Sequence, residues 1–173
     1  RGGLLAPAMA TDLPCWHMIG HLQRNKIKGL LRHSRVLHAL DSVRLVRELE
    51  KHAGKSGLTV DGFLEVNVAG EQAKSGASES EVAAIAEAVA DSPHLRLHGL
   101  MTMAPYDPDP EAARPHFSRL REMLDESRSK RLVAPECRPL SMGMSIDYAV
   151  AVEEGATFVR VGSSLFEGIG PVE

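Results

Sequence analysis

Short apolar runs alternate along the chain with longer stretches in which apolar residues recur every three to four positions. The short runs occupy residues 16–19, 36–40, 63–68, 95–103, 139–142 and 158–161. Residues 63–68 alternate apolar with polar side chains and include β-branched valines, a composition that is enriched in strands. Each run therefore predicts a β-strand, bounded by glycine, proline or polar residues.

The stretches between these runs predict helices. Apolar residues with helical spacing lie in residues 22–31, 43–55, 82–92, 117–124 and 148–153. Ser42 is a candidate N-cap for the second helix, and Gly155 is a plausible C-terminal glycine for the last one. Residues 104–110 contain three prolines and are expected to form a loop.

Strands that alternate with helices imply parallel βαβ units with right-handed crossovers. Two sheet architectures fit this pattern: an open, doubly wound sheet or a (β/α)8 barrel of the TIM type. A complete barrel takes about 200–250 residues, and this chain has 173. A barrel would lack its first one or two βα units, which we expect to precede Arg1. The prediction is one α/β domain spanning residues 1–173, N-terminally incomplete.

Composition narrows the functional classes. Apolar residues make up 43% and charged residues 25%, as in globular domains, and the net charge of -3 is unsuited to nucleic-acid binding driven by charge. The sequence shows no membrane-span run and no signal peptide. With two cysteines, one disulfide is neither implied nor excluded, and a reducing cytoplasm is the expected location. His17, His38 and His98 lack metal-site spacing and are expected to be satisfied core or rim residues.

Polar residues and glycines follow several predicted strands, where α/β proteins form their ligand sites. Residues 141–145 and 162–164 are rich in serine and glycine, and their backbone N–H groups could hold a phosphate. In isolation, an ordinary turn with a hydroxyl cap is the better explanation of each segment. Two such turns after consecutive final strands make phosphate binding an equally good explanation of the pair. Arg160 lies within an apolar strand and needs a partner, either a buried carboxylate or a ligand.

Five ordered motifs together resemble the pyridoxal-phosphate homeostasis proteins, single-domain relatives of the alanine racemase N-terminal barrel. Residues 16–26 (WHMIGHLQRNK) are similar to the family segment HFIG-x-LQ-x-NK. The others are a K-x-G loop at 74–76, the GLM strand at 99–101, the S-x-GMS-x-D turn at 141–147 and the closing GATFVRVGSSLF at 155–166. The likeness covers nearly the whole chain.

The resemblance implies a (β/α)8 barrel that binds pyridoxal 5'-phosphate (PLP). Its implied cofactor-binding residues are Ser141, Gly143, Met144, Ser145, Arg160, Gly162, Ser163, His17 and Ile19. The turns after the last two strands would hold the phosphate, and Arg160 would face the pyridine nitrogen. The family's Schiff-base lysine lies on the first strand, upstream of this chain, and no lysine here occupies that position. Glu167 replaces the family's usual glycine and places a negative charge near the phosphate turn.

The resemblance favours a carrier for intracellular vitamin B6 homeostasis over a catalyst. The alternative is a PLP enzyme of the same barrel type, such as an amino-acid racemase or decarboxylase. A third reading is an interaction protein whose barrel scaffolds contacts. The expected partners are PLP and PLP-dependent apo-enzymes, with no nucleic acid, no membrane and no metal, and the expected state is a monomer or weak dimer.

Overall fold

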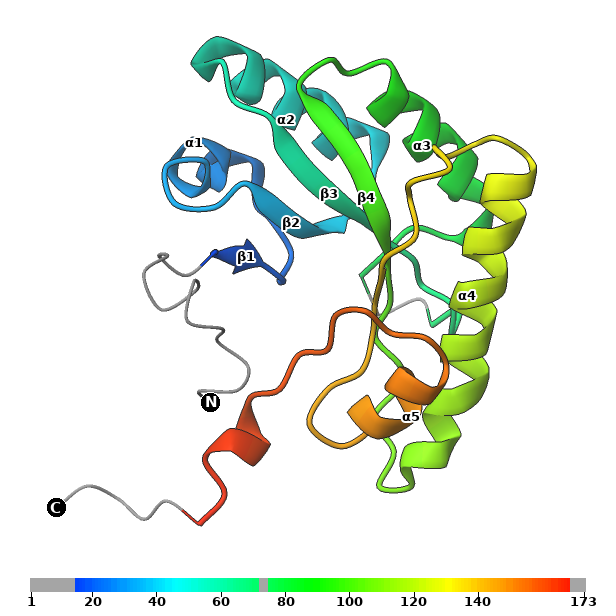
Figure 1. Ribbon diagram of the computed structural model, residues 1–173. Helices are drawn as coiled ribbons and strands as arrows, with labels where there is room; N and C mark the ends of the chain where they lie inside the picture. Colours follow the sequence, from blue (N-terminus) through cyan, green and yellow to red (C-terminus); the bar gives the residue numbers. More distant parts are fainter. Residues whose placement is uncertain (1–14, 72–74, 169–173) are drawn as a thin grey trace, which may run out of the picture.

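The computed structural model describes residues 15–71 and 75–168, which form a parallel sheet with helices packed against one of its sides (Figure 1). The strands are β1 (His17–Met18), β2 (Val36–Leu40), β3 (Val60–Glu65), β4 (Leu95–Met101) and β5 (Leu140–Ser141). The α-helices are α1 (Ile27–Leu30), α2 (Val43–Ser56), α3 (Val82–Ala90), α4 (Arg114–Ser129) and α5 (Tyr148–Glu153). Short 3-10 helices include η2 (Arg24–Lys26), η3 (Glu79–Glu81), η4 (Pro110–Ala113) and η5 (Ser163–Leu165).

The five strands lie in the order β1-β2-β3-β4-β5, and every neighbouring pair is parallel. A doubly wound sheet reverses its strand order at a switch point, and this order has no reversal. Strands that follow one another around a parallel sheet in sequence order are those of a (β/α)8 barrel. The described strands therefore form part of such a barrel, as predicted.

The sixth predicted strand, residues 158–161, is not a regular strand, and this expectation was wrong in detail. Only one parallel bridge is formed, between Ser141 and Phe158. The segment still runs beside β5, because Met142 N–H donates to the Phe158 carbonyl and Arg160 N–H donates to the Gly143 carbonyl. Gly143 has a φ of +91°, which ends the extended backbone of β5 after two residues, so the pairing with residues 158–161 does not continue as a regular ladder.

The helix boundaries follow local chemistry. Ser42 caps α2, since its Oγ accepts a hydrogen bond from the Leu45 N–H, as the sequence predicted. Gly155 follows α5 with a φ of +95°, the left-handed conformation that favours glycine. The helix expected at 22–31 is reduced to η2 and the single turn of α1, in which Gly29 is a weak helix former.

Arginines fix α5 in place at the lower end of α4 (Figure 1). Arg114 pairs with Glu153 at 2.6 Å and with Glu154 at 3.0 Å, and Arg121 pairs with Glu154 at 2.6 Å. These ion pairs matter for the site below, because the turn before α5 forms one of its walls.

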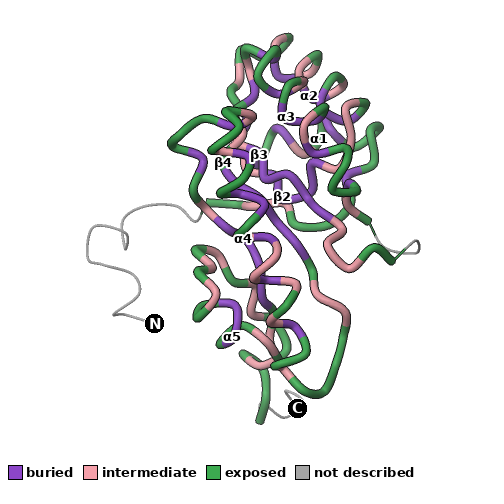
Figure 2. Tube along the Cα trace, turned by 90° about the vertical axis from the view of Figure 1, so that its right-hand side faces the viewer, coloured by how far each residue is buried: buried purple, intermediate pink, exposed green. Residues whose placement is uncertain are grey.

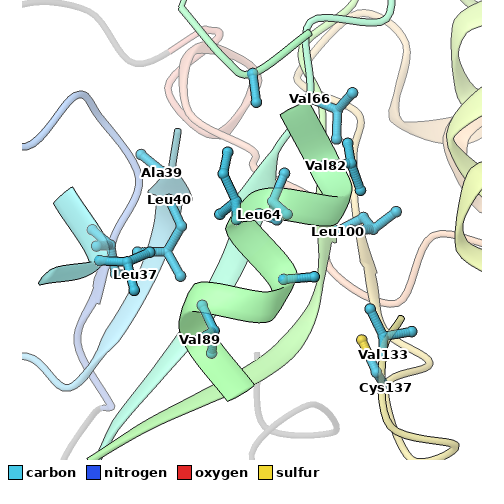
Figure 3. Close-up of a cluster of buried hydrophobic side chains, with 14 of the residues drawn as sticks. Leu37, Ala39, Leu40, Leu64, Val66, Val82, Val89, Leu100, Val133 and Cys137 are labelled. Atoms are coloured by element: carbon cyan, nitrogen blue, oxygen red, sulfur yellow. The ribbon is translucent and has the colours of Figure 1, made fainter. Parts of the chain in front are cut away.

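The hydrophobic core lies between the sheet and the helices. Alternate strand residues point into it, including Leu37, Ala39, Leu64 and Leu100, all at most 1% exposed. Figure 3 shows these side chains beside α3, which contributes Val82 and Val89. Along the chain, buried segments follow the strands while the helices alternate buried and exposed residues (Figure 2). The sheet is thus apolar on its helix-facing side.

Both cysteines are free: Cys15 is exposed and Cys137 is buried in this core. Burial raises the pKa of the Cys137 thiol to about 11. The thiol is therefore protonated at neutral pH, a state unsuited to nucleophilic chemistry.

Candidate functional site

A cavity of about 680 Å³ opens where the carboxyl ends of β4 and β5 meet segment 159–163. Most of the predicted site residues line it: Ile19, Gly143, Met144, Ser145, Arg160, Gly162 and Ser163. Ser141 and His17 do not line the cavity. They lie behind Arg160 and are connected to it by hydrogen bonds, which are described below.

The two serine-rich turns meet at one wall of the cavity. Ser145 Oγ accepts hydrogen bonds from the N–H of Gly162 at 3.2 Å and of Ser164 at 3.5 Å. The Ser164 hydroxyl is buried and has no hydrogen-bond partner among the described residues. A buried hydroxyl without a partner is costly unless a ligand or water supplies one. Backbone N–H groups and hydroxyls so arranged are typical of an anion site.

Gly143 allows the first of these turns to lie against α5. Its φ of +91° is strained for other residues, and a Cβ at this position would lie 2.5 Å from the Ala151 Cβ. The turn is closed by Asp147, whose Oδ1 accepts a hydrogen bond from the Met144 N–H at 2.6 Å. The sequence pattern G-M-S-x-D thus specifies a tight turn directly at the cavity.

Arg160 brings a positive charge to the cavity. Its Nη1 donates to Ser141 Oγ at 2.9 Å and its Nη2 donates to the Thr102 carbonyl at 3.0 Å. Among the described residues it forms no ion pair, so of the two partners that the sequence left open, the buried carboxylate is absent. Burial lowers the pKa of the guanidinium, and Asp147 and Glu65 act in the opposite direction. An arginine remains charged in any case, so the charge is available to a ligand.

A chain of hydrogen bonds leads from Arg160 into the inner face of the sheet, the side away from α2–α4. Ser141 Oγ lies 2.8 Å from His38 Nδ1, and His38 Nε2 lies 2.9 Å from His17 Nδ1. The His38 ring stacks on Phe63, with ring centroids 4.1 Å apart. The pKa of His38 is lowered to about 4, mainly by burial and further by the neighbouring His17, Arg160 and His98. The His38 ring is therefore neutral at neutral pH.

His38 is a satisfied core residue, as the sequence suggested, but its link to Arg160 was not anticipated. His98 is exposed and makes only ring contacts, with Phe63 and Phe158. No group of three or more His, Cys, Asp or Glu side chains within residues 15–71 and 75–168 is arranged to hold a metal ion.

The loop after β4 supplies the wall that sequence reasoning missed. Met103, Ala104, Pro105, Tyr106 and Asp107 all line the cavity. The signal was present, because this loop directly follows a predicted parallel strand, where ligand sites form. The prolines of this loop argue only against regular structure and do not by themselves indicate a cavity wall.

Lysines do not contribute to the cavity within the part of the chain that the structure describes. Lys26, Lys28, Lys51, Lys55 and Lys130 are all exposed, and none lines the cavity. Lys74, in the predicted K-x-G loop, lies outside the described residues. Ser75 of that loop donates a hydrogen bond to Glu65 Oε1 at 2.7 Å, and burial raises the pKa of this carboxyl at the end of β3.

Comparisons with known proteins agree with this geometry. The family model "Alanine racemase, N-terminal domain" matches residues 5–169. The chain is 43% identical over 152 residues to the pyridoxal phosphate homeostasis protein of Aquifex aeolicus, covering 87% of this chain and 65% of that protein. It is 41% identical over 164 residues to the homologue of the same name in Pseudomonas aeruginosa, covering 92% and 67%. The chain thus spans about two thirds of the length of these relatives.

Solved structures show the same likeness. PipY of Synechococcus elongatus, solved with PLP bound, matches with a TM-score of 0.78 and 31% identity over 92% of this chain and 74% of that one. An alanine racemase of Clostridium difficile matches with a TM-score of 0.72 at 12% identity over 96% and 43%. The second match bears on the fold alone, which is that of the racemase barrel.

Proposed function

Because the chain belongs to the alanine racemase N-terminal domain family, and within it to the pyridoxal phosphate homeostasis proteins, we propose that it binds PLP. The role we propose is that of a carrier in intracellular vitamin B6 homeostasis rather than a catalyst. The observation that carries this proposal is the convergence of Arg160 and two hydroxyl-bearing turns on one cavity.

The chemistry of the cavity fits the phosphate of PLP. Ser145 and Ser163 line the cavity. Ser164 lies behind this wall: its N–H donates to Ser145 Oγ, and its buried hydroxyl has no partner among the described residues. Hydrogen bonds to an anionic phosphate are stronger than those between neutral groups. In this proposal the hydroxyls of Ser145 and Ser163 donate to the phosphate, together with the Gly162 N–H, which donates to Ser145 Oγ in the free protein. Gly143 gives the Ser145 turn its shape.

Arg160 fits the pyridine nitrogen of PLP. Bound PLP supplies an electron-withdrawing ring, and the strength of that withdrawal depends on the partner of the ring nitrogen. A guanidinium has only donors and keeps its protons, so it would face an unprotonated nitrogen. That arrangement makes the ring a weaker electron sink, which favours holding the cofactor over carbanion chemistry.

We also propose a location, partners and an oligomeric state for the protein. It would act in the cytoplasm, where PLP-dependent apo-enzymes would receive the PLP. It would be a monomer or a weak dimer. None of the described helices is long and apolar enough to cross a bilayer.

Equilibrium dialysis of the protein against PLP, with pyridoxal as the comparison ligand, tests the phosphate assignment. We expect saturable PLP binding that inorganic phosphate competes with, and at least about tenfold weaker binding of pyridoxal, which lacks the phosphate. The double variant Ser145→Ala/Ser163→Ala should weaken PLP about 5- to 150-fold. Ser129→Ala, on the surface of α4, is the matched control. Equal affinity for PLP and pyridoxal would contradict the proposal.

The visible absorbance of bound PLP tests the ring assignment. Arg160→Ala should shift the absorbance while the far-ultraviolet circular dichroism stays unchanged, since the side chain alters the ring nitrogen and not the fold. We also expect none of the five described lysines to retain PLP after borohydride reduction and peptide mapping, because they lie outside the cavity. A single modified internal lysine would mean that the cofactor is anchored elsewhere.

A further inference from the structure

Four polar side chains far apart in sequence form one hydrogen-bonded chain across the inner face of the sheet. It runs from Arg160 to Ser141, then to His38 on β2 and His17 on β1, with heavy-atom distances of 2.9, 2.8 and 2.9 Å. Ser141 is fully buried and His38 is 2% exposed. The packing of an apolar core does not require such a chain. Which group donates in each hydrogen bond decides what the chain can do.

The direction follows from the donors at its end. Arg160 can only donate, so Ser141 Oγ accepts from it. The hydroxyl proton of Ser141 then points to His38 Nδ1, which must be the unprotonated ring nitrogen. His38 consequently carries its proton on Nε2 and donates to His17 Nδ1. Both imidazoles are thereby fixed as neutral Nε2–H tautomers.

The opposite direction is disfavoured by burial. If His38 Nδ1 carried the proton, Ser141 would accept from both neighbours, and its own hydroxyl proton would have no acceptor among the described residues. A buried donor without a partner is costly, because it gives up its hydrogen bond to water and gains none in return. A doubly protonated His38 would leave the same unpaired hydroxyl and would add a charge facing Arg160, His17 and His98.

Resting on the proposed PLP site, we propose that His38 is a positioning residue that acts through Ser141 to hold the Arg160 guanidinium toward the cavity. With the Ser141 proton directed at His38, the lone pairs of its oxygen are left for Arg160 Nη1. Phe63 keeps the His38 ring in plane by stacking against it at 13°. Without the imidazole acceptor, the serine hydroxyl rotates freely and Arg160 loses one of its two fixed partners.

The tautomers can be read without any cofactor. Nitrogen-15 NMR of the histidine rings in the free protein should show Nε2–H for both His38 and His17, with neither ring charged at neutral pH. A protonated Nδ1 on His38 would overturn the proposed direction. Because this measurement uses no PLP, its result is independent of whether the proposed function holds.

The positioning role is tested by a double-variant cycle on PLP affinity and absorbance. His38→Leu should weaken PLP about 2- to 12-fold, the range for losing one neutral hydrogen bond, and shift the absorbance in the direction seen for Arg160→Ala. In Arg160→Ala, the further change His38→Leu should add nothing, since His38 acts only through Arg160. Additive losses would overturn the role.

Two more variants keep the experiment decisive. His38→Gln retains a hydrogen-bond acceptor and a donor, so its PLP affinity should lie between those of His38→Leu and the unmodified protein. If His38→Leu does not fold, His38→Gln takes its place in the double-variant cycle. His98→Leu is the matched control, because His98 shares the contact with Phe63 and lies outside the hydrogen-bonded chain. An equal effect of His98→Leu would indicate a packing role only. If the unmodified protein binds no PLP, the proposed function and this role both fall, whatever the tautomers.

Discussion

The two faces of the sheet are built from alternate residues of the same strands, and they differ in what holds them together. Leu37, Leu64 and Leu100 face the helices and are at most 1% exposed. On the opposite face, His38, Glu65 and Ser141 are buried nearly as deeply, yet all three are polar. Each of the latter has a specific hydrogen-bond partner.

The difference separates stability from specificity. An apolar side chain on the helix side contributes by leaving water, about 1.5–3 kcal/mol for a leucine, and many neighbours serve equally well. A buried polar side chain contributes little net energy, but it is costly when its partner is missing. The helix side should therefore tolerate apolar substitutions that conserve volume, and the inner side should be sensitive to the loss of a hydrogen-bond partner.

The largest effect is expected on the helix side. Leu64→Ala removes a fully buried side chain from the core and should lower the free energy of unfolding by about 2–5 kcal/mol. Chemical denaturation followed by circular dichroism measures this loss. Leu64→Met, which nearly conserves volume, should cost less than about 1.5 kcal/mol.

An inner-face control sharpens that result. His98→Ala lies on β4, is exposed and removes only ring contacts, so it should cost less than about 1 kcal/mol. A loss of unfolding free energy as large as that of Leu64→Ala would show that the inner face contributes as much to stability as the helix-facing side.

The pH dependence of stability should come from the inner face. The pKa of His38 is about 4 in the folded protein against an ordinary value of 6.5, so the unfolded chain binds a proton at this residue first as pH falls. The contribution of His38 to stability is therefore complete above about pH 6.5 and declines toward pH 4, by on the order of 3 kcal/mol. The buried Glu65 carboxyl, whose pKa is raised, acts in the opposite direction. Denaturation at several pH values measures the slope, and His38→Gln should flatten it. An unchanged slope in that variant would assign the acid sensitivity to other groups.

What the sequence could predict follows the same division. The strands on either side of Leu64 and the cap at Ser42 were predictable, because period and capping are local signals. The alternation of strands and helices alone left the choice between a barrel and a doubly wound sheet open, since that choice depends on strand order; the resemblance of the five motifs to a barrel family supplied the prediction. At the site, Ser145 and Gly162 stood out by following strands. The link from His38 to Ser141 joins residues 103 positions apart, and no local pattern encodes it.

Ser141→Ala removes only the Oγ atom that joins His38 to Arg160 and leaves the size of the side chain nearly unchanged. It deprives both His38 and Arg160 of a partner, and the free energy of unfolding should fall by about 1–3 kcal/mol. The ring nitrogens of His38 should also lose their fixed tautomer in nitrogen-15 spectra. Ser129→Ala on α4 serves as the control for the loss of a hydroxyl. No change in either quantity would mean that the inner chain is held by packing alone.

The smallest effect concerns Glu167, an exposed charge that belongs to neither face. It follows the turn that contains Ser163 by four residues, and a negative charge there opposes the binding of an anionic phosphate. Glu167→Gln should tighten PLP binding about two- to fivefold at low salt, as expected for an exposed charge worth up to about 1 kcal/mol. The gain should vanish near 1 M salt, where the screening length falls to about 3 Å. Glu136→Gln, at another exposed glutamate that does not line the cavity, controls for net charge. A gain that persists in high salt would show that Glu167 acts through the shape of the turn rather than through its charge.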